Sequence, residues 1–324
     1  MVMSITLSLH KGKIIYLYVK INGEPMSRIL KAMIVTPMLL LICSSFTFAS
    51  KIMIAKAALS AGLLPFQLGL SGNFGAAILL FLLVRIHSEK IPTTRRHLAL
   101  YTSLALISFA APTVLSYAVV DRVGPAYTST VYSLSPILTM SFAAGLGVER
   151  MFVRRAIGIL IGFVGMIALV QQQLTLIDTE QTLWILLGLL IPAFAALGNI
   201  VRTRFWPEGT SAQAFACATL LASCLIILVM APMFEDVTQW RLTSYSDWGW
   251  TIGMIAILAL LYVLNFQLQK IAGPVIFSQI GYWGTGFGVV LSALLFGDLL
   301  SGLALLGLCM IICGGLIARK PASQ

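Results

Sequence analysis

Long apolar segments separated by short polar ones make up most of this chain. A helix needs roughly 20 apolar residues to cross a hydrocarbon layer of about 30 Å. Ten segments meet that length, at residues 32–51, 65–86, 98–120, 125–147, 153–171, 182–202, 212–232, 248–269, 274–297 and 302–318. They are continuously apolar, whereas the strands of a membrane barrel alternate. The pattern predicts an all-α integral membrane protein with ten transmembrane helices.

The composition supports lipid as the solvent. Hydrophobic residues make up 59% of the chain and charged residues 10%, against about 25% charged residues in soluble domains. The net charge of +10 would also suit nucleic acid, but the basic residues lie in short gaps and form no basic domain. We therefore expect the lipid bilayer, and not nucleic acid, as a partner.

The basic residues indicate the orientation. Ten spans place both termini and the even-numbered loops on one side, with 17 of the 21 lysines and arginines, Arg202 among them. The other side has Lys51, Lys56, Arg122 and Arg241. Because basic residues collect on the cytoplasmic side, both termini are predicted to be cytoplasmic, in a multi-pass protein of the inner (plasma) membrane.

The chain ends are predicted to be cytoplasmic tails, at residues 1–31 and 319–324. The first 25 residues are mixed and weakly amphipathic, without the apolar core of a signal peptide. Two interpretations remain open: Met26 is the true start, or residues 1–25 are a disordered or surface-lying tail.

An internal repeat relates the two halves at a constant offset of 149 residues. The matched pairs are Gly124-Pro125 with Gly273-Pro274, Glu149 with Asp298, Gly158 with Gly307, and Gly165 with Gly314. The halves are residues 32–171 and 182–318, with five spans each. Because five is odd, the second half enters the membrane inverted, as in many transporters.

Two stretches carry a family resemblance. They are "GLLPFQLGLSGNFGAAILLFLL" at 62–83 and "SPILTMSFAAGLGVERMFVRRAIGILIGFVGMIAL" at 135–169. Together with the ten spans, they resemble the drug/metabolite transporter superfamily, EamA type, over roughly 32–318. The resemblance implies secondary transport, commonly export, of a small metabolite through a central cavity. The second repeat departs from the family pattern, with Thr285 in place of Pro136. The arginine often found in the family's second span is also absent, where Gly69, Ser71 and Asn73 stand.

Polar side chains inside apolar spans are the candidates for lining a substrate path. Asn265 and Gln279 are the strongest, because an amide in hydrocarbon must find partners for its donors and its acceptor. The alternative for both is an interhelical hydrogen bond. The other candidates are Tyr282, Trp283, Tyr117, Tyr132, Asn199 and Lys51. Core packing is the alternative for the aromatic rings of Tyr282 and Trp283. Lys51 lies near the outer end of the first span, where snorkelling to the surface is the favoured interpretation. If Lys51 faces inward, it suits a substrate carboxylate.

Other residues are candidates for gating or for structure. Glu149 and Asp298 mark equivalent helix junctions, and Glu149 is expected to pair with a nearby arginine and latch the inner gate. Pro136 is expected to kink its helix. Small residues indicate close helix packing, at Gly158 in the fifth span and at Gly284 and Gly288 in the ninth.

Several kinds of chemistry are not expected. The sequence has no phosphate loop of the GxxxxGK[ST] type and no zinc motif, so we expect no enzyme activity, cofactor or metal. The five cysteines are expected to be free thiols. No carboxylate lies deep in a predicted span, so proton coupling is expected to be weak, indirect or absent.

The leading hypothesis is a secondary transporter that exports an amino-acid-like or drug-like metabolite, as a monomer or homodimer. A sugar-phosphate or nucleotide-sugar carrier would need cationic groups in the cavity, and Lys51 is the only candidate. A lipid-modifying membrane enzyme and a non-transporting scaffold are the alternatives from other classes.

Overall fold

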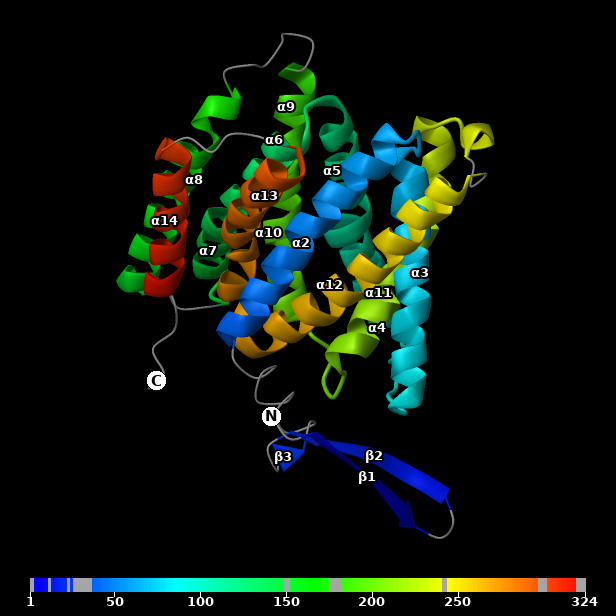
Figure 1. Cartoon of the computed structure of the whole chain (residues 1–324). Coiled ribbons are helices and arrows are strands. Elements are labelled where there is room, and N and C mark those ends of the chain that lie inside the picture. Colours follow the sequence, from blue (N-terminus) through cyan, green and yellow to red (C-terminus); the bar gives the residue numbers. More distant parts are fainter. Residues whose placement is uncertain are drawn as a thin grey trace. The chain divides into compact units, whose positions relative to one another are not determined.

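The computed structural model describes residues 3–10, 13–21, 24–25, 37–148, 152–174, 182–240, 244–296 and 302–318 (Figure 1). The chain divides into two units, Met1–Leu40 and Leu41–Gln324.

The first unit contains a three-stranded antiparallel sheet in the order β1-β2-β3. The strands are β1 (Met3–His10), β2 (Lys13–Ile21) and β3 (Glu24–Pro25). The first pair runs from Met3 opposite Ile21 to His10 opposite Lys13. Strand-favouring β-branched and aromatic residues in "KIIYLYVKI" are consistent with this structure. The sequence prediction included no strand here, and the position of Met26 lies outside the described residues.

The second unit is helical, which confirms the all-α prediction for the described residues from 37 to 318. Its first half contains α2 (Pro37–Ser60), α3 (Pro65–Ile86), α4 (Arg95–Leu104), η1 (Ala105–Ala110), α5 (Ala111–Arg122), α6 (Pro125–Val131), η2 (Tyr132–Leu134), α7 (Ser135–Gly145) and α8 (Val153–Leu174). Its second half contains α9 (Thr182–Gly188), α10 (Leu190–Arg204), α11 (Ala212–Phe234), η4 (Val237–Gln239), α12 (Tyr245–Ser278), α13 (Ile280–Phe296) and α14 (Gly302–Ile317).

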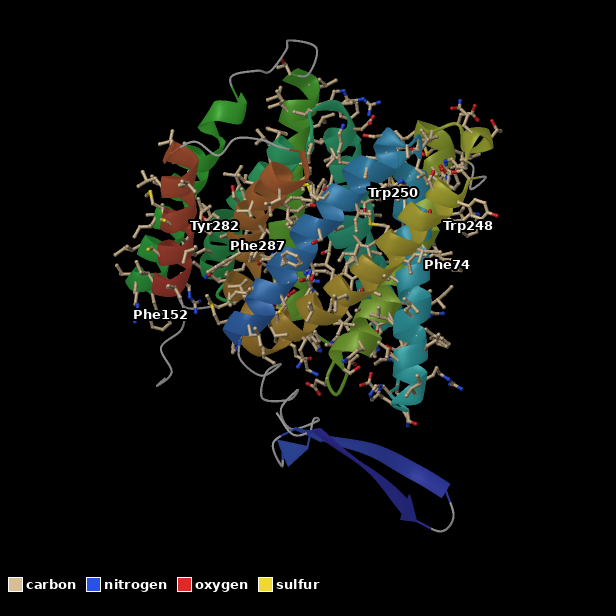
Figure 2. The ribbon with its side chains drawn as sticks, viewed as in Figure 1. Phe74, Phe152, Trp248, Trp250, Tyr282 and Phe287 are labelled. Atoms are coloured by element: carbon tan, nitrogen blue, oxygen red, sulfur yellow. The ribbon has the colours of Figure 1, made fainter. Side chains whose placement is uncertain are left out.

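Six helical stretches within the described residues are long and apolar enough to cross a membrane. They are Pro37–Ser60, Pro65–Ile86, Arg95–Arg122, Thr182–Arg204, Ala212–Phe234 and Tyr245–Ser278. Large apolar side chains are exposed on the helices, such as Val229 on α11 and Phe74 on α3, which Figure 2 labels. Lipid is the solvent that this surface requires.

Proline interrupts several of these helices. Pro112 follows the π-helical turn η1, and Pro136 follows the 3₁₀ turn η2. Gly273, with φ of 80°, and Pro274 break the geometry of α12. A proline inside a helix has no N–H to donate to the preceding turn, so the local hydrogen-bond pattern must change.

Helices α3 and α11 pack antiparallel, far apart in sequence. Near one end, the ring of Phe66 stacks on that of Phe234 with centroids 5.6 Å apart. Further along, Cys217 Sγ donates to Ala77 O at 3.6 Å. The Phe66 N–H also donates to Glu235 Oε1 at 2.7 Å, so a carboxylate just after α11 accepts from the start of α3.

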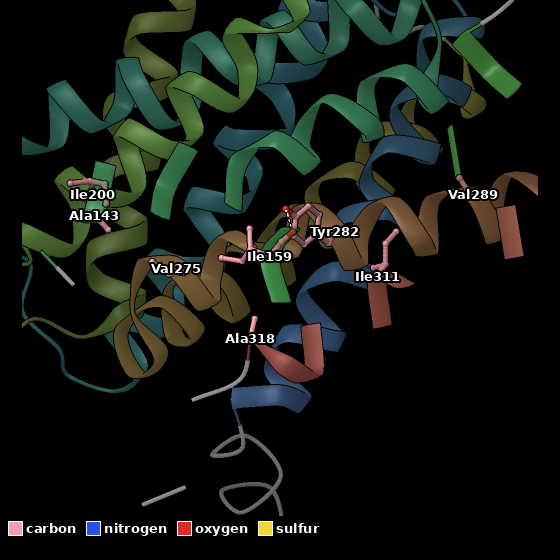
Figure 3. Packing of buried hydrophobic residues seen from close by; sticks show 8 residues of the cluster. All are labelled: Ala143, Ile159, Ile200, Val275, Tyr282, Val289, Ile311 and Ala318. Carbon is pink, nitrogen blue, oxygen red and sulfur yellow. Dashed lines mark hydrogen bonds between the residues drawn. The ribbon is translucent and has the colours of Figure 1, made fainter. Parts of the chain in front are cut away.

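Helices α8 and α14 form a second antiparallel pair, side by side in Figure 1. A Cβ at Gly158 would lie 2.5 Å from the Ala318 amide nitrogen, and one at Gly165 would lie 2.7 Å from Gly307 O. The two backbones are therefore in close contact, as glycine allows. A buried cluster adjoins this pair (Figure 3), and it contains Ala143, Ile159, Ile200, Val275, Tyr282, Val289, Ile311 and Ala318.

Candidate functional site

A partly open cavity lies among the helices of the second unit. Its lining residues are Phe48, Lys51, Ser108, Phe109, Pro112, Thr113, Tyr132, Ser135, Ala195, Asn199, Arg202, Leu261, Tyr262, Asn265, Phe277, Ser278, Ile280 and Gly281. This mixture of apolar walls with a few polar groups is typical of small-molecule sites. Lys51, Tyr132, Asn199 and Asn265, which were named above as candidates, are among these residues.

Broken helices surround the cavity. Ser108 and Phe109 come from the π-turn η1, and Tyr132 comes from the 3₁₀ turn η2. A π-turn inserts extra backbone and thereby changes the direction in which side chains point. Pro112 and Pro136 thus shape the wall from which these residues extend.

Lys51 lies inside the protein, at the cavity. Its side chain is 5% exposed, and its Nζ lies 5.5 Å from the ring centre of Phe48 and 5.3 Å from that of Tyr117. Lys51 was expected to snorkel to the membrane surface, but its side chain points inward. Aromatic faces attract the ammonium there. Tyr117 packs behind Lys51 without lining the cavity, and its hydroxyl donates to Met254 Sδ at 3.6 Å.

Arg202 on α10 is the main residue that sequence reasoning missed. It was counted among the basic residues of the membrane surface, yet it is 4% exposed and lines the cavity. Its guanidinium carbon lies 4.7 Å from the ring centre of Phe266 and 5.0 Å from that of Phe277. Its Nη2 donates to Asn199 Oδ1 at 3.0 Å, while its Nε has no hydrogen-bond partner among the described atoms.

Asn199 connects three neighbouring elements. Its Nδ2 donates to Thr139 Oγ1 on α7 at 3.3 Å, and its backbone oxygen accepts from Gln269 Nε2 on α12 at 2.8 Å. Because Asn199 and Arg202 are three residues apart, they share one face of α10. This network holds the arginine in position. The spacing of an amide and an arginine inside a predicted span was the signal that could have revealed it.

The two strongest sequence candidates differ in position. Asn265 lines the cavity, and its Oδ1 has no partner among the described atoms. Gln279 is 1% exposed, and neither polar atom of its amide has a described partner. It does not line the cavity, although its chain neighbours Ser278 and Ile280 do.

The hydroxyl groups at the cavity are linked to one another and to the surrounding helices. Tyr132 and Ser116 share a hydrogen bond of 2.6 Å. The Tyr262 hydroxyl donates to Asn73 Oδ1 on α3 at 3.2 Å. In the sequence, Asn73 was noted only as a departure from the family pattern. Its hydrogen bond to the cavity wall was therefore not predicted.

Tyr282 and Trp283 lie away from the cavity. The Tyr282 hydroxyl donates to Ile159 O at 2.9 Å, and its ring belongs to the cluster beside α8 and α14 (Figure 3). Trp283 Nε1 lies against α14, 2.6 Å from where a Cβ at Gly315 would be. Core packing, the alternative interpretation, describes both. Both side chains point from α13 toward α8 and α14.

The proposed structural and gating residues have mixed outcomes. Gly158 forms the contact with α14 described above. A Cβ at Gly284 would lie 2.7 Å from Phe48 Cδ1, and Gly288 is buried on the same helix. Glu149 and Asp298 lie outside the described residues, so their pairing stays a prediction. Within the described part of the chain, no group of three or more His, Cys, Asp or Glu residues could hold a metal ion.

Comparison with known proteins shows that part of the chain is similar to a family of transporters. Residues 35–171 match the model of the EamA-like transporter family. None of the curated proteins matches the sequence. A solved structure titled only as the crystal structure of a protein is similar at a TM-score of 0.70 and 15% identity. The match covers 86% of this chain and 95% of that chain, and it shows a shared fold. The family match confirms the resemblance predicted from the sequence: over residues 35–171, the chain is similar to the EamA-like family of membrane transporters.

Proposed function

We propose that this chain is a secondary transporter that exports a small organic metabolite by alternating access through the cavity. The main supporting observation is that both halves of the chain line one cavity. Lys51, Ser108 and Tyr132 come from the first half, and Asn199, Arg202 and Asn265 from the second. A site between two related halves is where such transporters bind their substrates.

The helix boundaries support two related halves of about 149 residues. Helix α6 begins at Pro125, and the helical stretch after Gly273 begins at Pro274. Likewise, α8 begins at Val153 and α14 at Gly302, which is again 149 residues later. We therefore propose the domain organisation of residues 32–171 and 182–318 as two five-span repeats.

The packing of equivalent helices supports an inverted relation. Gly158 meets Gly314, the counterpart of Gly165, while Gly165 meets Gly307, the counterpart of Gly158. Such reciprocal contacts are the pattern of a two-fold axis. Helices α3 and α11, which occupy equivalent places, are also antiparallel. An axis in the membrane plane would give this arrangement, and it would allow each half to open one side in turn.

We further propose that four more predicted segments, 125–147, 153–171, 274–297 and 302–318, cross the membrane, for ten spans in all. Each contains at least one apolar helix of the described structure. Segment 125–147 is interrupted by the 3₁₀ turn η2, so it is not one continuous α-helix. With ten spans, the basic residues favour cytoplasmic termini in the plasma membrane.

Transport by purified protein in proteoliposomes is the direct test. Candidate solutes would come from an untargeted comparison of metabolites in cells with and without the gene. The variant Asn265→Ala is expected to slow transport while the amount of folded protein is unchanged, because its side chain is part of the cavity lining. Ser141→Ala, at an exposed position on α7, is the control. Solute movement that the Asn265→Ala variant leaves unchanged would show that this residue is not part of the site. A wild-type protein that moves no solute would favour the scaffold alternative.

A further inference from the structure

We infer that the cavity selects a small organic oxyanion, a carboxylate or a phosphate ester with an apolar body, through Lys51 and Arg202. This inference rests on the proposed transport function and names its substrate class. It starts from the charges, because two cationic side chains line one cavity.

No carboxylate balances these two charges among the described residues. None of the cavity-lining residues is Asp or Glu. Arg202 has Asn199 and aromatic rings as neighbours, and Lys51 has Phe48 and Tyr117. An ionised group inside a protein is costly unless an opposite charge and hydrogen bonds compensate it. The cavity lining therefore has an excess of positive charge that an anion would offset.

The N–H groups of Arg202 and Lys51 are suited to binding an oxyanion. Asn199 occupies Nη2 of Arg202 and fixes the guanidinium, while Nε has no described partner. A guanidinium with free N–H groups binds a carboxylate or phosphate through directed, charge-assisted hydrogen bonds. Lys51 adds a point charge on a flexible stem at the same cavity.

The rest of the cavity fits the body of such a ligand. Phe48, Phe109, Leu261 and Phe277 provide apolar walls. Asn265 adds an amide to the lining, and an amide oxygen can accept from an N–H or O–H group of a ligand. The expected substrate is thus amphipathic, with an anionic head, an apolar body and one hydrogen-bond donor.

The aromatic rings alone are a weaker explanation for the two cations. Cation–π contacts attract a charge but give the Nε–H donor of Arg202 no acceptor. A cationic substrate is disfavoured, since it would add a third positive charge to the cavity. An anion also needs no proton partner for export, because an interior-negative membrane potential drives it outward.

Binding to the purified full-length protein in detergent tests the inference. We would titrate benzoate, phenyl phosphate, benzamide and benzylamine, which share an aromatic body and differ in head group. We expect benzoate or phenyl phosphate to bind at least about tenfold more tightly than benzamide, and benzylamine not to bind. A preference between the two anions would identify the head group as carboxylate or phosphate.

Matched variants locate the effect. Arg202→Gln and Lys51→Gln should each weaken anion binding at least about tenfold and leave benzamide binding unchanged. The controls Arg204→Gln and Lys56→Gln remove a basic group from the same helices at more accessible positions, and they should retain anion binding. If Arg202→Gln does not fold, the wild-type ligand series and Lys51→Gln still decide the question.

Two outcomes would overturn the inference: equal or tighter binding of benzamide or benzylamine, or equal losses in the controls and the cavity variants. Its failure is distinguishable from failure of the proposed transport. Anion binding without solute movement in proteoliposomes would remove only the transport proposal. Transport of a neutral or cationic solute without anion binding would remove only the anion inference.

Discussion

The cavity and the outer helix pairs differ in whether their buried polar groups have hydrogen-bond partners. Helices α3, α8, α11 and α14 form the two antiparallel pairs, which we call the frame. Among the described residues, no buried polar side-chain atom of the frame lacks a hydrogen-bond partner. At the cavity, by contrast, Ser108 Oγ, Arg202 Nε and Asn265 Oδ1 all lack one.

This difference in hydrogen bonding indicates that the frame stabilises the fold and that the cavity binds a ligand. A buried polar group without a partner costs about 1–3 kcal/mol, so it weakens the fold unless a ligand or water satisfies it. The frame also runs without the π and 3₁₀ turns found in the cavity wall. We interpret the frame as the stable scaffold and the cavity as the part whose unsatisfied groups await a substrate.

The largest expected effect is on transport by Arg202→Gln. We expect the rate for an anionic solute to fall by about tenfold to a hundredfold, because a charge-assisted hydrogen bond is worth about 1.5–3 kcal/mol. Thermal stability should stay equal to wild type or rise, since an uncompensated buried charge is removed. Proteoliposome flux and thermal unfolding measure the two quantities. A large fall in stability with unchanged transport would assign Arg202 to the scaffold instead.

A second prediction concerns the glycine contact of the frame. Gly158→Ala should lower the free energy of unfolding by about 1–3 kcal/mol, because its Cβ would press on the backbone of α14. Gly253→Ala is the matched control, since no heavy atom lies within 4 Å of its Cβ position. Thermal or denaturant unfolding in detergent gives both values. If the two variants were equally stable, the close contact between α8 and α14 would be disproved.

Two amide variants compare a buried amide without partners with one that is hydrogen-bonded. Gln279→Leu should stabilise the protein, by about 1 kcal/mol or more, because neither polar atom of its amide has a described partner. Asn73→Leu on α3 should destabilise it by about 1–3 kcal/mol, because it removes the acceptor of Tyr262 and the donor to Ser223. Unfolding curves for both variants measure the signs. Two shifts of the same sign would contradict the distinction between unpartnered and hydrogen-bonded amides.

The smallest effect is a pH dependence at the edge of the frame. Burial raises the pKa of Glu235 above its usual value, although hydrogen bonds from Phe66 and Trp240 oppose this. Stability from this group is therefore present at low pH and lost as the pH rises through the raised pKa. Glu235→Gln should flatten the curve of melting temperature between about pH 4 and 6.

The exposed carboxylate next in sequence provides the control. A hydrogen bond from Thr238 lowers the pKa of Asp236. Its contribution to stability is lost as the pH falls, which is the opposite direction. Asp236→Asn should thus change the curve on its acid side. A Glu235→Gln variant with the wild-type slope would show that Glu235 titrates alike in the folded and unfolded chain.

Much of the fold was predictable because lipid imposes long apolar runs. The ends of α3 and α11 lie close to the predicted segments 65–86 and 212–232. The strands of residues 3–25 were not predicted, because their polar and apolar residues fit a surface-lying tail as well as a sheet.

The candidate site was predictable only in part. An amide inside an apolar segment is conspicuous, which identified Asn199 and Asn265. Arg202 was missed because a basic residue near a helix end has the same sequence pattern whether it reaches the surface or turns inward. The rings of Phe266 and Phe277, which come from another helix, decide its direction. Tyr282 was expected at the cavity but lies away from it. Tertiary packing, which the sequence does not reveal, directs its ring toward α8.

Access to the cavity from both sides of the membrane is the most direct test of the central claim. A single cysteine would replace Ser108 in a background without the five native cysteines, and membrane-impermeant thiol reagents would be added from either side of oriented vesicles. The account predicts labelling from each side, and less labelling when a transported solute is present. Labelling from one side alone, unchanged by solute, would contradict alternating access through this cavity.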